Sequence, residues 1–453
     1  MNEEYTKGVK ILLGDPKKAI LKLSGPMVIA MLTQSLYNLA DAIWVSGIGT
    51  DALAAIGLFF PINMIIISLA SGLSVGGSSA ISRKIGERNK NLASIAAMNS
   101  LLIGFILGIL ITLLLFPVIR FILIIVGASG NVLNLTLEYS RIIISFSIPI
   151  VFSNIAGGIL RGEGDTKRTM FAMVTGSVLN VIIDPIFIYV FKLGVAGAAY
   201  ATVLSIMVSC LMLFYFLFIK KDTYVSLSRK DLKLHRGLII EILRVGIPAS
   251  FVQLTMSLSI FILNRLIISL GGPQGIAIFT TAWRIVTFGS IPLLGIGTGV
   301  TAVTGAAFGA KDKEKLNTGY MYSIKIGLLI ELFVLLFISI FARQISFLFT
   351  FSKASSEILK PLIIAMRVLV FFLPTTPLGM FTSAMFQGIK QGEKSFVVTF
   401  LRTIVFQILF AYLFGYLLRL NLIGVWVGIV FGNLCGSTLG FIWGRITIKK
   451  LTF

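Results

Sequence analysis

The sequence predicts an all-α integral membrane protein in which twelve transmembrane helices form two six-helix lobes related by a parallel repeat. Three observations support this fold class: a very apolar composition, twelve apolar runs of membrane-spanning length, and motifs that recur about halfway along the chain. Of 453 residues, 57% are hydrophobic and only 13% are charged, whereas soluble domains carry about 25% charged residues. A folded core cannot bury this surplus of apolar side chains, so we expect it to face lipid.

The apolar runs account for the predicted spans one by one. A helix needs about 20 mostly apolar residues to cross a bilayer. The runs cover 23–45, 52–81, 92–119, 133–160, 169–191, 195–219, 238–270, 275–308, 318–341, 358–386, 395–418 and 422–444. Two cysteines and one histidine in the chain argue against a disulfide framework, a Cys/His zinc site and chemistry that needs several histidines.

The basic residues indicate how these spans are oriented. The net charge is +21, from 39 basic and 18 acidic residues. The termini and the even-numbered loops hold 26 basic residues, whereas the odd-numbered loops hold five. The positive-inside rule therefore predicts that both termini are cytoplasmic. No basic cluster is interleaved with stacking aromatic residues, so we predict no nucleic-acid partner.

A long polar segment divides the chain. It covers 220–237 and separates a predicted amino-terminal lobe, 1–219, from a predicted carboxyl-terminal lobe, 238–453. Each lobe contains six of the predicted spans. Since six is even, both lobes start on the same membrane face and form a parallel repeat.

Motifs recur between the two halves at nearly constant spacing. Pro26 recurs as Pro248, and the glycine-rich run at 72–76 recurs at 295–299. These offsets are 222 and 223 residues, and they rise to 226 and 227 near the end of each half. Two similar bundles that face each other enclose a cleft, which favours a transporter that works by alternating access.

Apart from acidic residues in loops, at the termini or close to the span ends, three lie inside predicted spans, namely Asp41, Asp184 and Glu331. A charged group at the bilayer centre costs about 2.5–3.5 kcal/mol, so such residues are functional candidates. Helical spacing places both aspartates on polar faces. These faces comprise Gln34, Tyr37, Asn38 and Asp41 in the first span, Ser177, Asn180 and Asp184 in the fifth, and Thr202 and Ser205 in the sixth. If the faces converge, the pocket can hold protons or a hard cation such as Na⁺, and both alternatives stay open.

Several of these residues also have a structural interpretation. Asp184 is followed by a proline and could belong to a kinked helix end. Glu331 has no polar neighbour one turn away, so a packed ion pair with an arginine and a functional role are both open. Pro26 permits a bend in the first span, which is either a gate or an ordinary kink. Methionines on the early spans offer an adaptable surface for ligands or simply pack. They include Met27, Met31 and Met173.

Four motifs stand within or beside the spans of the first half. They are QSLYNLAD at 34–41, RGEGDTK at 161–167, NVIIDP at 180–185 and GVAGAA at 194–199. Together with six spans in each half, these motifs resemble the multidrug and toxic compound extrusion (MATE) family, and in particular its DinF-like and archaeal branch.

The resemblance implies an inner-membrane antiporter, not an enzyme, that expels cationic or amphiphilic small molecules in exchange for Na⁺ or H⁺. It implies a bend of the first helix at Pro26. The implied coupling-ion residues are Asp41, Asn180, Asp184 and Thr202, where Na⁺ is the candidate metal. The implied substrate-chamber residues are Gln34, Tyr37, Asn38, Asn154, Met173 and Ser177, to which we add Met27 and Met31. No cofactor other than the coupling ion is expected.

Other functions remain open at this point. A flippase for a lipid-linked precursor has the same two-lobe plan and predicts a lateral opening lined by basic residues such as Arg284 and Arg367. A membrane-embedded enzyme is disfavoured because no span contains a histidine or a recognisable catalytic pair. A passive channel would conduct without ion coupling. We expect a monomer surrounded by membrane lipid.

Overall fold

The computed structural model describes residues 5–228, 233–350 and 357–453, and within these ranges every regular element is a helix. The α-helices are α1 (Lys7–Leu13), α2 (Pro16–Ser46), α3 (Thr50–Gly86), α4 (Lys90–Ile125), α5 (Gly130–Ser145), α6 (Ser147–Gly162), α7 (Thr166–Pro185), α8 (Gly194–Phe214), α9 (Arg236–Gly289), α10 (Ile291–Gly309), α11 (Lys313–Phe349), α12 (Leu359–Leu369), α13 (Thr376–Gly388), α14 (Gly392–Phe400), α15 (Gln407–Tyr412) and α16 (Asn421–Lys450). Short π- or 3₁₀-helices interrupt or extend them: η1 (Ile186–Val190), η2 (Tyr215–Ile219), η5 (Val370–Thr375), η6 (Leu401–Phe406) and η7 (Leu413–Leu417).

These helices account for the predicted membrane spans. Among the described residues, eleven helices are long and apolar enough to cross a membrane, and the bent pair α5 and α6, whose axes differ by 51°, brings the number to twelve. The predicted run at 238–270 and the start of the next one lie in α9, where the chain turns at Gly272 with φ 57° and ψ −159°. The predicted all-α membrane fold is therefore confirmed.

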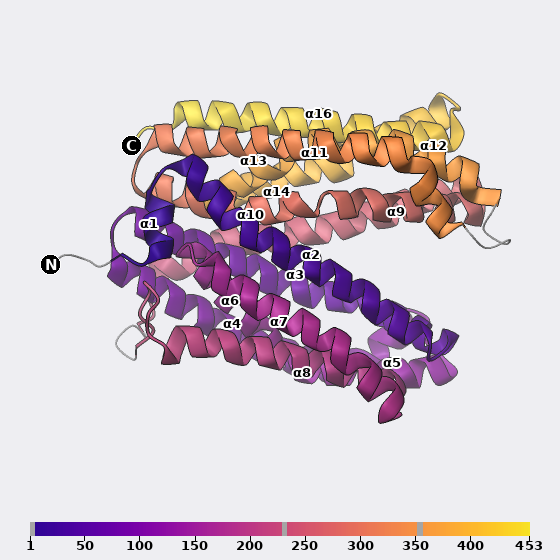
Figure 1. Ribbon diagram of the computed structural model, residues 1–453, viewed down its shortest axis with the longest axis horizontal. Helices are drawn as coiled ribbons and strands as arrows, with labels where there is room; N and C mark the ends of the chain where they lie inside the picture. The colour runs from indigo at the N-terminus through magenta and orange to yellow at the C-terminus, as the bar shows by residue number, and fades with distance from the viewer. Residues whose placement is uncertain (1–4, 229–232, 351–356) are drawn as a thin grey trace.

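The two halves of the chain lie on opposite sides of the molecule (Figure 1). Helices α4 to α8, drawn in purple to magenta, form the lower side, and α11 to α16, drawn in orange to yellow, form the upper side. Helix α3 packs along α9 and α10, and α2 packs against α7 and α10, so these helices join the halves. Helix α1 and the carboxyl end of α16 lie at the same end of the molecule.

Backbone conformation repeats between the halves. Positive φ angles occur in pairs at helix ends: Arg88 and Lys311 (both 57°), Lys192 and Arg419 (55° and 56°), and Gly194 and Asn421 (both 54°). The π-helices η1 and η7 begin at residues 186 and 413. The separations are 223 and 227 residues, as in the sequence motifs, so the duplication extends to the backbone. The lobe boundaries at 219 and 238 stay a prediction, and residues 229–232 of the predicted linker lie outside the described residues.

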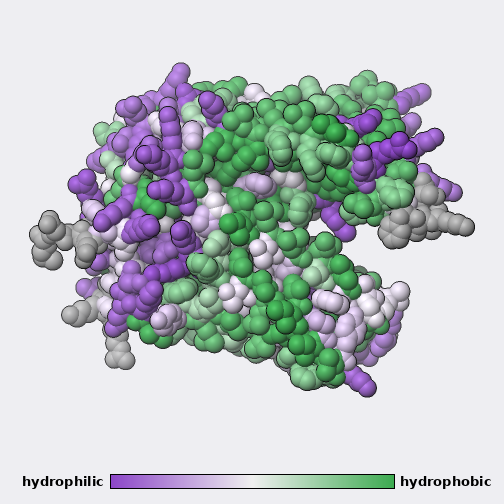
Figure 2. All heavy atoms as spheres, in the orientation of Figure 1, coloured by the Kyte–Doolittle hydropathy of each residue, from purple (hydrophilic) through white to green (hydrophobic). Residues whose placement is uncertain are grey.

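The surface is apolar over much of the molecule (Figure 2). Hydrophilic side chains gather most densely at the end that carries α1, and a hollow separates the two halves at the opposite end. Phe121, Phe333 and Leu348 are 67%, 70% and 70% exposed. In water, large apolar side chains exposed over so wide a belt would be unfavourable, so this belt is the lipid-facing surface of a multi-pass membrane protein.

The chain that follows η2 is anchored to the end of α6 by a buried carboxylate. Glu163 Oε2 accepts hydrogen bonds from the backbone nitrogens of Tyr224, at 3.0 Å, and Val225, at 3.1 Å. Only 1% of Glu163 is exposed. Burial, which disfavours the charged form, raises the pKa of the Glu163 carboxyl from its ordinary 4.5 to about 8.

This pKa predicts a pH-dependent stability. The folded protein binds the Glu163 proton more tightly than the unfolded chain does, so protonation contributes fully at low pH, and the contribution is lost as the pH rises through about 8. We expect the thermal unfolding midpoint to fall more steeply in the wild-type protein than in Glu163→Gln as the pH rises from about 4.5 to about 8, the interval in which only the folded form holds the proton. The exposed Glu87→Gln variant is the control, and equal slopes for the wild type and Glu163→Gln would contradict the prediction.

Candidate functional site

A cavity of about 500 Å³ lies mainly among α2, α3, α6, α7 and α8. It is lined by all eight residues that the sequence associates with substrate: Met27, Met31, Gln34, Tyr37, Asn38, Asn154, Met173 and Ser177. Helices α9 and α10 close one side of it with Gln253, Thr298 and Thr301. The structure therefore brings the predicted chamber residues together, while their role in binding stays a prediction.

Local helical geometry explains why these side chains meet. Residues three or four positions apart share one face of a helix, which places Met27, Met31, Gln34 and Asn38 in a row along α2. Helix α7 packs against α2 and against α8, so its own polar face is opposite that row. The cavity has an apolar part and a polar part, as small-molecule sites commonly do.

The two predicted aspartates face each other beside this cavity. The carboxyl groups of Asp41 and Asp184 lie close enough to interact electrostatically. Asn180 Nδ2 donates to Asp184 Oδ1 at 3.2 Å. Three buried oxygens, Asp41 Oδ1, Asn180 Oδ1 and Asp184 Oδ2, have no hydrogen-bond donor among the residues that the structure describes. Since buried polar atoms are normally paired, this cluster of oxygens is suited to a proton or a small hard cation.

The helix changes its winding next to this cluster. Helix α7 ends at Pro185, and the chain continues as the π-helix η1. The irregular helix end considered for Asp184 is therefore present. The Asp184 side chain is nevertheless completely buried and faces Asp41. The proline alone therefore does not explain why an aspartate stands at this position.

Tyr139 joins the cluster, although the sequence did not single it out. Its ring is buried in α5 and packs edge-on to Phe59, with 5.7 Å between the ring centroids. Its hydroxyl lies beside Thr202 and near both aspartates. The only sequence signal was a tyrosine within a predicted span, and helical spacing does not reveal which neighbouring helix such a residue meets.

Arg161 is a second lining residue that the sequence assigned only to a loop motif. Helix α6 extends to Gly162, so Arg161 still belongs to the helix and borders the cavity. Its Nη2 donates to Ser74 Oγ at 2.8 Å, and Ser74 Oγ donates to the Asn154 carbonyl oxygen at 2.6 Å. No ion pair joins Arg161 to any carboxylate of the described chain. The cavity thus carries a positive charge in addition to the acidic cluster.

The comparison with known proteins decides the family. The MatE family profile matches residues 26–186 and, a second time, residues 248–413. The chain belongs to the MatE family. The resemblance found in the sequence motifs is therefore confirmed, and the double match agrees with the repeated backbone.

Solved MATE structures share the fold of this MatE protein closely. One, described as the outward-facing conformation of a multidrug resistance MATE family transporter, is 52% identical over 99% of this chain and 100% of its own, with a TM-score of 0.96. A MOP superfamily transporter from Pyrococcus furiosus gives the same identity, coverage and TM-score. The multidrug export protein MepA of Staphylococcus aureus is 27% identical over 84% of this chain and 83% of its own length.

The remaining predicted residues of this MatE protein lie elsewhere. Helix α2 continues without interruption through Pro26. Glu331 is completely buried in α11, and neither of its carboxylate oxygens has a partner among the described residues. The packed ion pair considered for Glu331 is therefore not formed, because no arginine of a neighbouring helix reaches it. Arg284 and Arg367 have exposed side chains.

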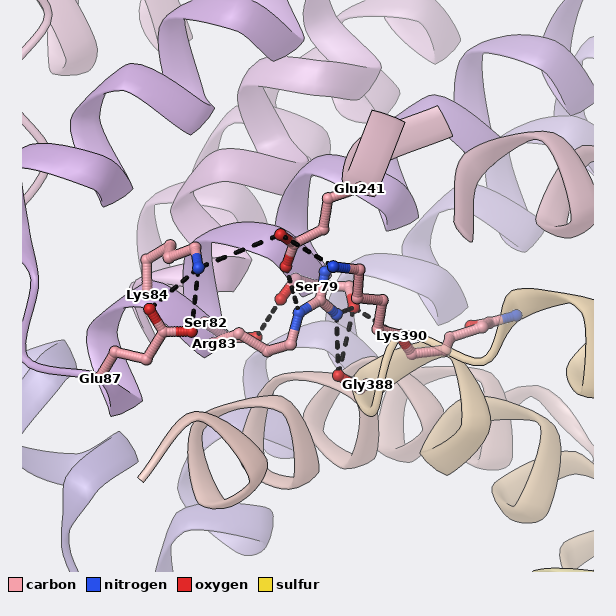
Figure 3. A network of polar contacts seen from close by, with 9 residues as sticks. Ser79, Ser82, Arg83, Lys84, Glu87, Glu241, Gly388 and Lys390 are labelled. Atoms are coloured by element: carbon pink, nitrogen blue, oxygen red, sulfur yellow. Dashed lines mark hydrogen bonds and ion pairs between the residues drawn. The ribbon is translucent and has the colours of Figure 1, made fainter. Parts of the chain in front are cut away.

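A buried polar network joins the two halves near the hydrophilic end (Figure 3). Arg83 of α3 donates from Nε to Glu241 Oε1 of α9 at 2.8 Å, and from Nη1 to the Gly388 carbonyl oxygen at 2.9 Å. Lys390 Nζ lies 3.4 Å from Glu241 Oε2. Arg83 and Glu241 are only 1% and 6% exposed. We call these four residues the closing network, because they tie α3 to α9 and to the end of α13.

Small residues let the helices approach closely beside the closing network. A Cβ added at Gly72 of α3 would lie 2.6 Å from the Ser250 backbone nitrogen, and one added at Gly76 would lie 2.3 Å from the Ile242 carbonyl oxygen, both in α9. Real Cβ atoms do not approach backbone atoms so closely, so larger side chains would force α3 and α9 apart. This end of the molecule is therefore tightly packed, in contrast to the hollow at the other end.

Proposed function

We propose that this protein is a cation-coupled antiporter that exports cationic or amphiphilic organic compounds by alternating access of two lobes. The observation that carries the proposal is the set of three donor-free oxygens of Asp41, Asn180 and Asp184 beside the cavity. The names of its relatives support export: MepA is called a multidrug export protein. The moving bodies would be the predicted lobes 1–219 and 238–453, joined by 220–237.

The coupling ion would be held by Asp41, Asn180, Asp184 and Thr202. Carboxylate, amide and hydroxyl oxygens suit Na⁺, and two facing carboxyl groups can instead share protons. No other cofactor is required. Either ion neutralises the cluster, which weakens its attraction for a cationic substrate in the adjacent cavity. Ion entry and substrate release are thereby linked.

The cavity would hold the substrate. Its volume of about 500 Å³ is within the range of about 300–1,000 Å³ that is usual for small-molecule sites. Tyr37, Gln34 and Asn38 supply polar contacts, while Met27 and Met31 supply polarisable surface that adapts to different shapes. This combination supports binding of chemically varied amphiphiles.

The closing network would be the cytoplasmic barrier. If the basic end of the molecule lies in the cytoplasm of a cell with an inner membrane, as the positive-inside rule predicts, the hollow opens outward and Arg83–Glu241 closes the inner side. A bend of α2 at Pro26 would then reshape the cavity wall during the exchange of access. The transporter is proposed to act as a monomer.

The test is efflux of a fluorescent cationic dye from proteoliposomes that contain the purified full-length chain. A sodium gradient and a pH gradient are imposed separately, with the membrane potential clamped. We expect one or both gradients to drive the dye against its own concentration gradient. Dye movement that only follows its own gradient, whatever the ion gradient, would refute antiport.

The Tyr139→Phe variant tests the extent of the ion site. Removing the hydroxyl takes away one oxygen near the cluster, an effect comparable to the loss of one hydrogen bond, about 1 kcal/mol. We expect the apparent affinity for the driving ion to fall by roughly fivefold, with an unchanged dye affinity. Tyr200→Phe, at an exposed position on α8, is the control. An unchanged ion affinity in Tyr139→Phe would exclude Tyr139 from the site.

A further inference from the structure

Helix α16, which runs along the upper edge of the molecule in Figure 1, borders an open apolar groove. The groove has a volume of about 760 Å³ and follows one face of α16 from Phe431 to Ile446. Phe406 of η6 contributes to its wall from the neighbouring helix. Phe431, Ile442 and Ile446 are 41%, 52% and 44% exposed. The groove therefore belongs to the lipid-facing belt of the protein.

The groove is long enough for the acyl chain of a membrane lipid. Phe431 and Ile446 are 15 positions apart on a continuous helix, which corresponds to about 22 Å along its axis. One leaflet contributes about 15 Å of hydrocarbon to a bilayer. At the far end of the groove, Phe431 packs edge-on against Phe410, with 4.8 Å between the ring centroids. An acyl chain that enters near Ile446 can thus lie in the groove over the whole depth of its leaflet.

Two lysines stand at the end of the groove that is nearest the carboxyl terminus. Lys394 of α14 places its Nζ 5.7 Å from the ring centroid of Trp443, which lines the groove, and 3.4 Å from Thr447 Oγ1. Lys450 follows Ile446 by one helical turn and lies close enough to Lys394 for the two charges to interact. Like charges repel each other, so the two lysines favour an anion between them.

The protein itself does not neutralise these two lysines. In the described ranges 5–228, 233–350 and 357–453, neither lysine forms an ion pair with a carboxylate. Glu393, whose charge also reaches Lys394, pairs with Arg244 at 2.7 Å. Trp443 contacts Lys394 and the groove alike, and tryptophan is enriched at the level of the lipid headgroups. The two positive charges therefore lie where the headgroup of a lipid in the groove would be.

The groove and the lysines together select one kind of occupant. A free phosphate ion would leave the groove uncovered, and a zwitterionic lipid would bring a positive charge of its own to the lysines. A lipid with a net anionic headgroup complements both features, because basic side chains beside a membrane helix attract such lipids. We infer that this groove binds an anionic phospholipid, with an acyl chain along α16 and its phosphate between Lys394 and Lys450.

This inference does not depend on the proposed antiport. The groove lies on the outer side of α16, whereas the cavity among α2, α7 and α8 has no lining residue in common with it. A lipid at Lys394 and Lys450 would remain bound whether or not Asp41 and Asp184 couple transport to an ion.

Brominated lipids measure the occupancy of the groove, because bromine atoms on an acyl chain quench tryptophan fluorescence on contact. The full-length protein is reconstituted in phosphatidylcholine bilayers that contain increasing fractions of brominated phosphatidylglycerol or of brominated phosphatidylcholine. The quenching that disappears in Trp443→Phe is the contribution of Trp443. We expect phosphatidylglycerol to be preferred at this tryptophan by a factor of about five for each lysine, and therefore about 25-fold for both.

Matched double variants test the two lysines. Lys394→Gln combined with Lys450→Gln should remove the preference for phosphatidylglycerol while quenching by both lipids persists. Lys7→Gln combined with Lys10→Gln is the control, because it removes two positive charges from exposed positions on α1 at the same end of the molecule. The control should retain the preference of the wild type.

Native mass spectrometry of the wild-type protein from mixed bilayers identifies the occupant directly. We expect monomers that retain phosphatidylglycerol in preference to phosphatidylcholine. Equal quenching of Trp443 by the two lipids would overturn the proposal, as would dimers in which a second copy of the chain covers the groove. An unchanged preference in the Lys394→Gln and Lys450→Gln double variant would also overturn it. The wild-type comparison needs no lysine variant, so it decides the question even if that double variant fails to fold.

Discussion

Replacing Asp184 by asparagine is expected to lower ion-driven dye export by proteoliposomes strongly. The substitution keeps the size of the side chain and its contact with Asn180 but removes one of two facing carboxyl groups. The cluster then loses half of the charge that attracts a cation or stores a proton. A coupling free energy of 1–3 kcal/mol corresponds to a loss of roughly 5–150-fold in driven transport. Asp41→Asn is expected to have the same effect.

The control for both substitutions is Asp51→Asn. Asp51 accepts a hydrogen bond from Asn131 Nδ2 at 2.8 Å on the exposed surface, outside the cluster. Its variant should transport like the wild type. If Asp41→Asn and Asp184→Asn both export dye normally under each ion gradient, the coupling site has been placed wrongly, whereas membership of the MatE family is unaffected.

Replacing Glu241 by glutamine is expected to open the end of the molecule that the closing network seals. The variant leaves the Arg83 charge buried without a carboxylate, which costs about 3–5 kcal/mol in measured cases. Each 1.4 kcal/mol changes an equilibrium constant tenfold. The ratio of molecules open at this end to molecules closed there should therefore rise by at least about two orders of magnitude. Exposed Glu393, which pairs with Arg244 at 2.7 Å, provides the control Glu393→Gln, worth about 0–1 kcal/mol.

Thiol labelling measures this opening. Ser82 is completely buried beside the closing network, so a Ser82→Cys protein, with Cys210 and Cys435 replaced by alanine, reports whether water-soluble maleimide reaches it. We expect fast labelling with Glu241→Gln and slow labelling with Glu393→Gln. The double substitution Arg83→Met with Glu241→Leu should restore slow labelling, because it removes both charges. Slow labelling in Glu241→Gln would mean that the network does not hold this end closed.

Helical periodicity was sufficient to place Gln34 and Asn38 on one face of the first span, whereas their assignment to a substrate chamber came from the family resemblance. The row Met27, Met31, Gln34 and Asn38 is a property of one helix, so its spacing in the sequence determines its common face. The number of spans and the internal repeat were equally accessible, because both depend on composition and offsets along the chain.

Contacts between distant helices could not be predicted in this way. Arg83 and Glu241 are 158 positions apart, and no local pattern indicates that they meet. The same reason explains why the sequence left the surroundings of Glu331 open and did not single out Tyr139, since each depends on which neighbouring helix faces the side chain. The 51° bend between α5 and α6 is different, because Pro149 cannot donate a hydrogen bond to the carbonyl of Ser145, where α5 ends. The sequence therefore contains a local signal for this bend.

The positions of the π-helices in the two halves indicate which irregularities the halves inherited in common. A π-turn spans one residue more than an α-turn, so it persists as a local irregularity wherever the extra residue is inherited. Helices η1 and η7 occupy equivalent positions, which dates their shared irregularity to a single six-helix ancestor, before the gene was doubled. Helix η6 has no equivalent in α7, so this irregularity distinguishes the second copy from the first.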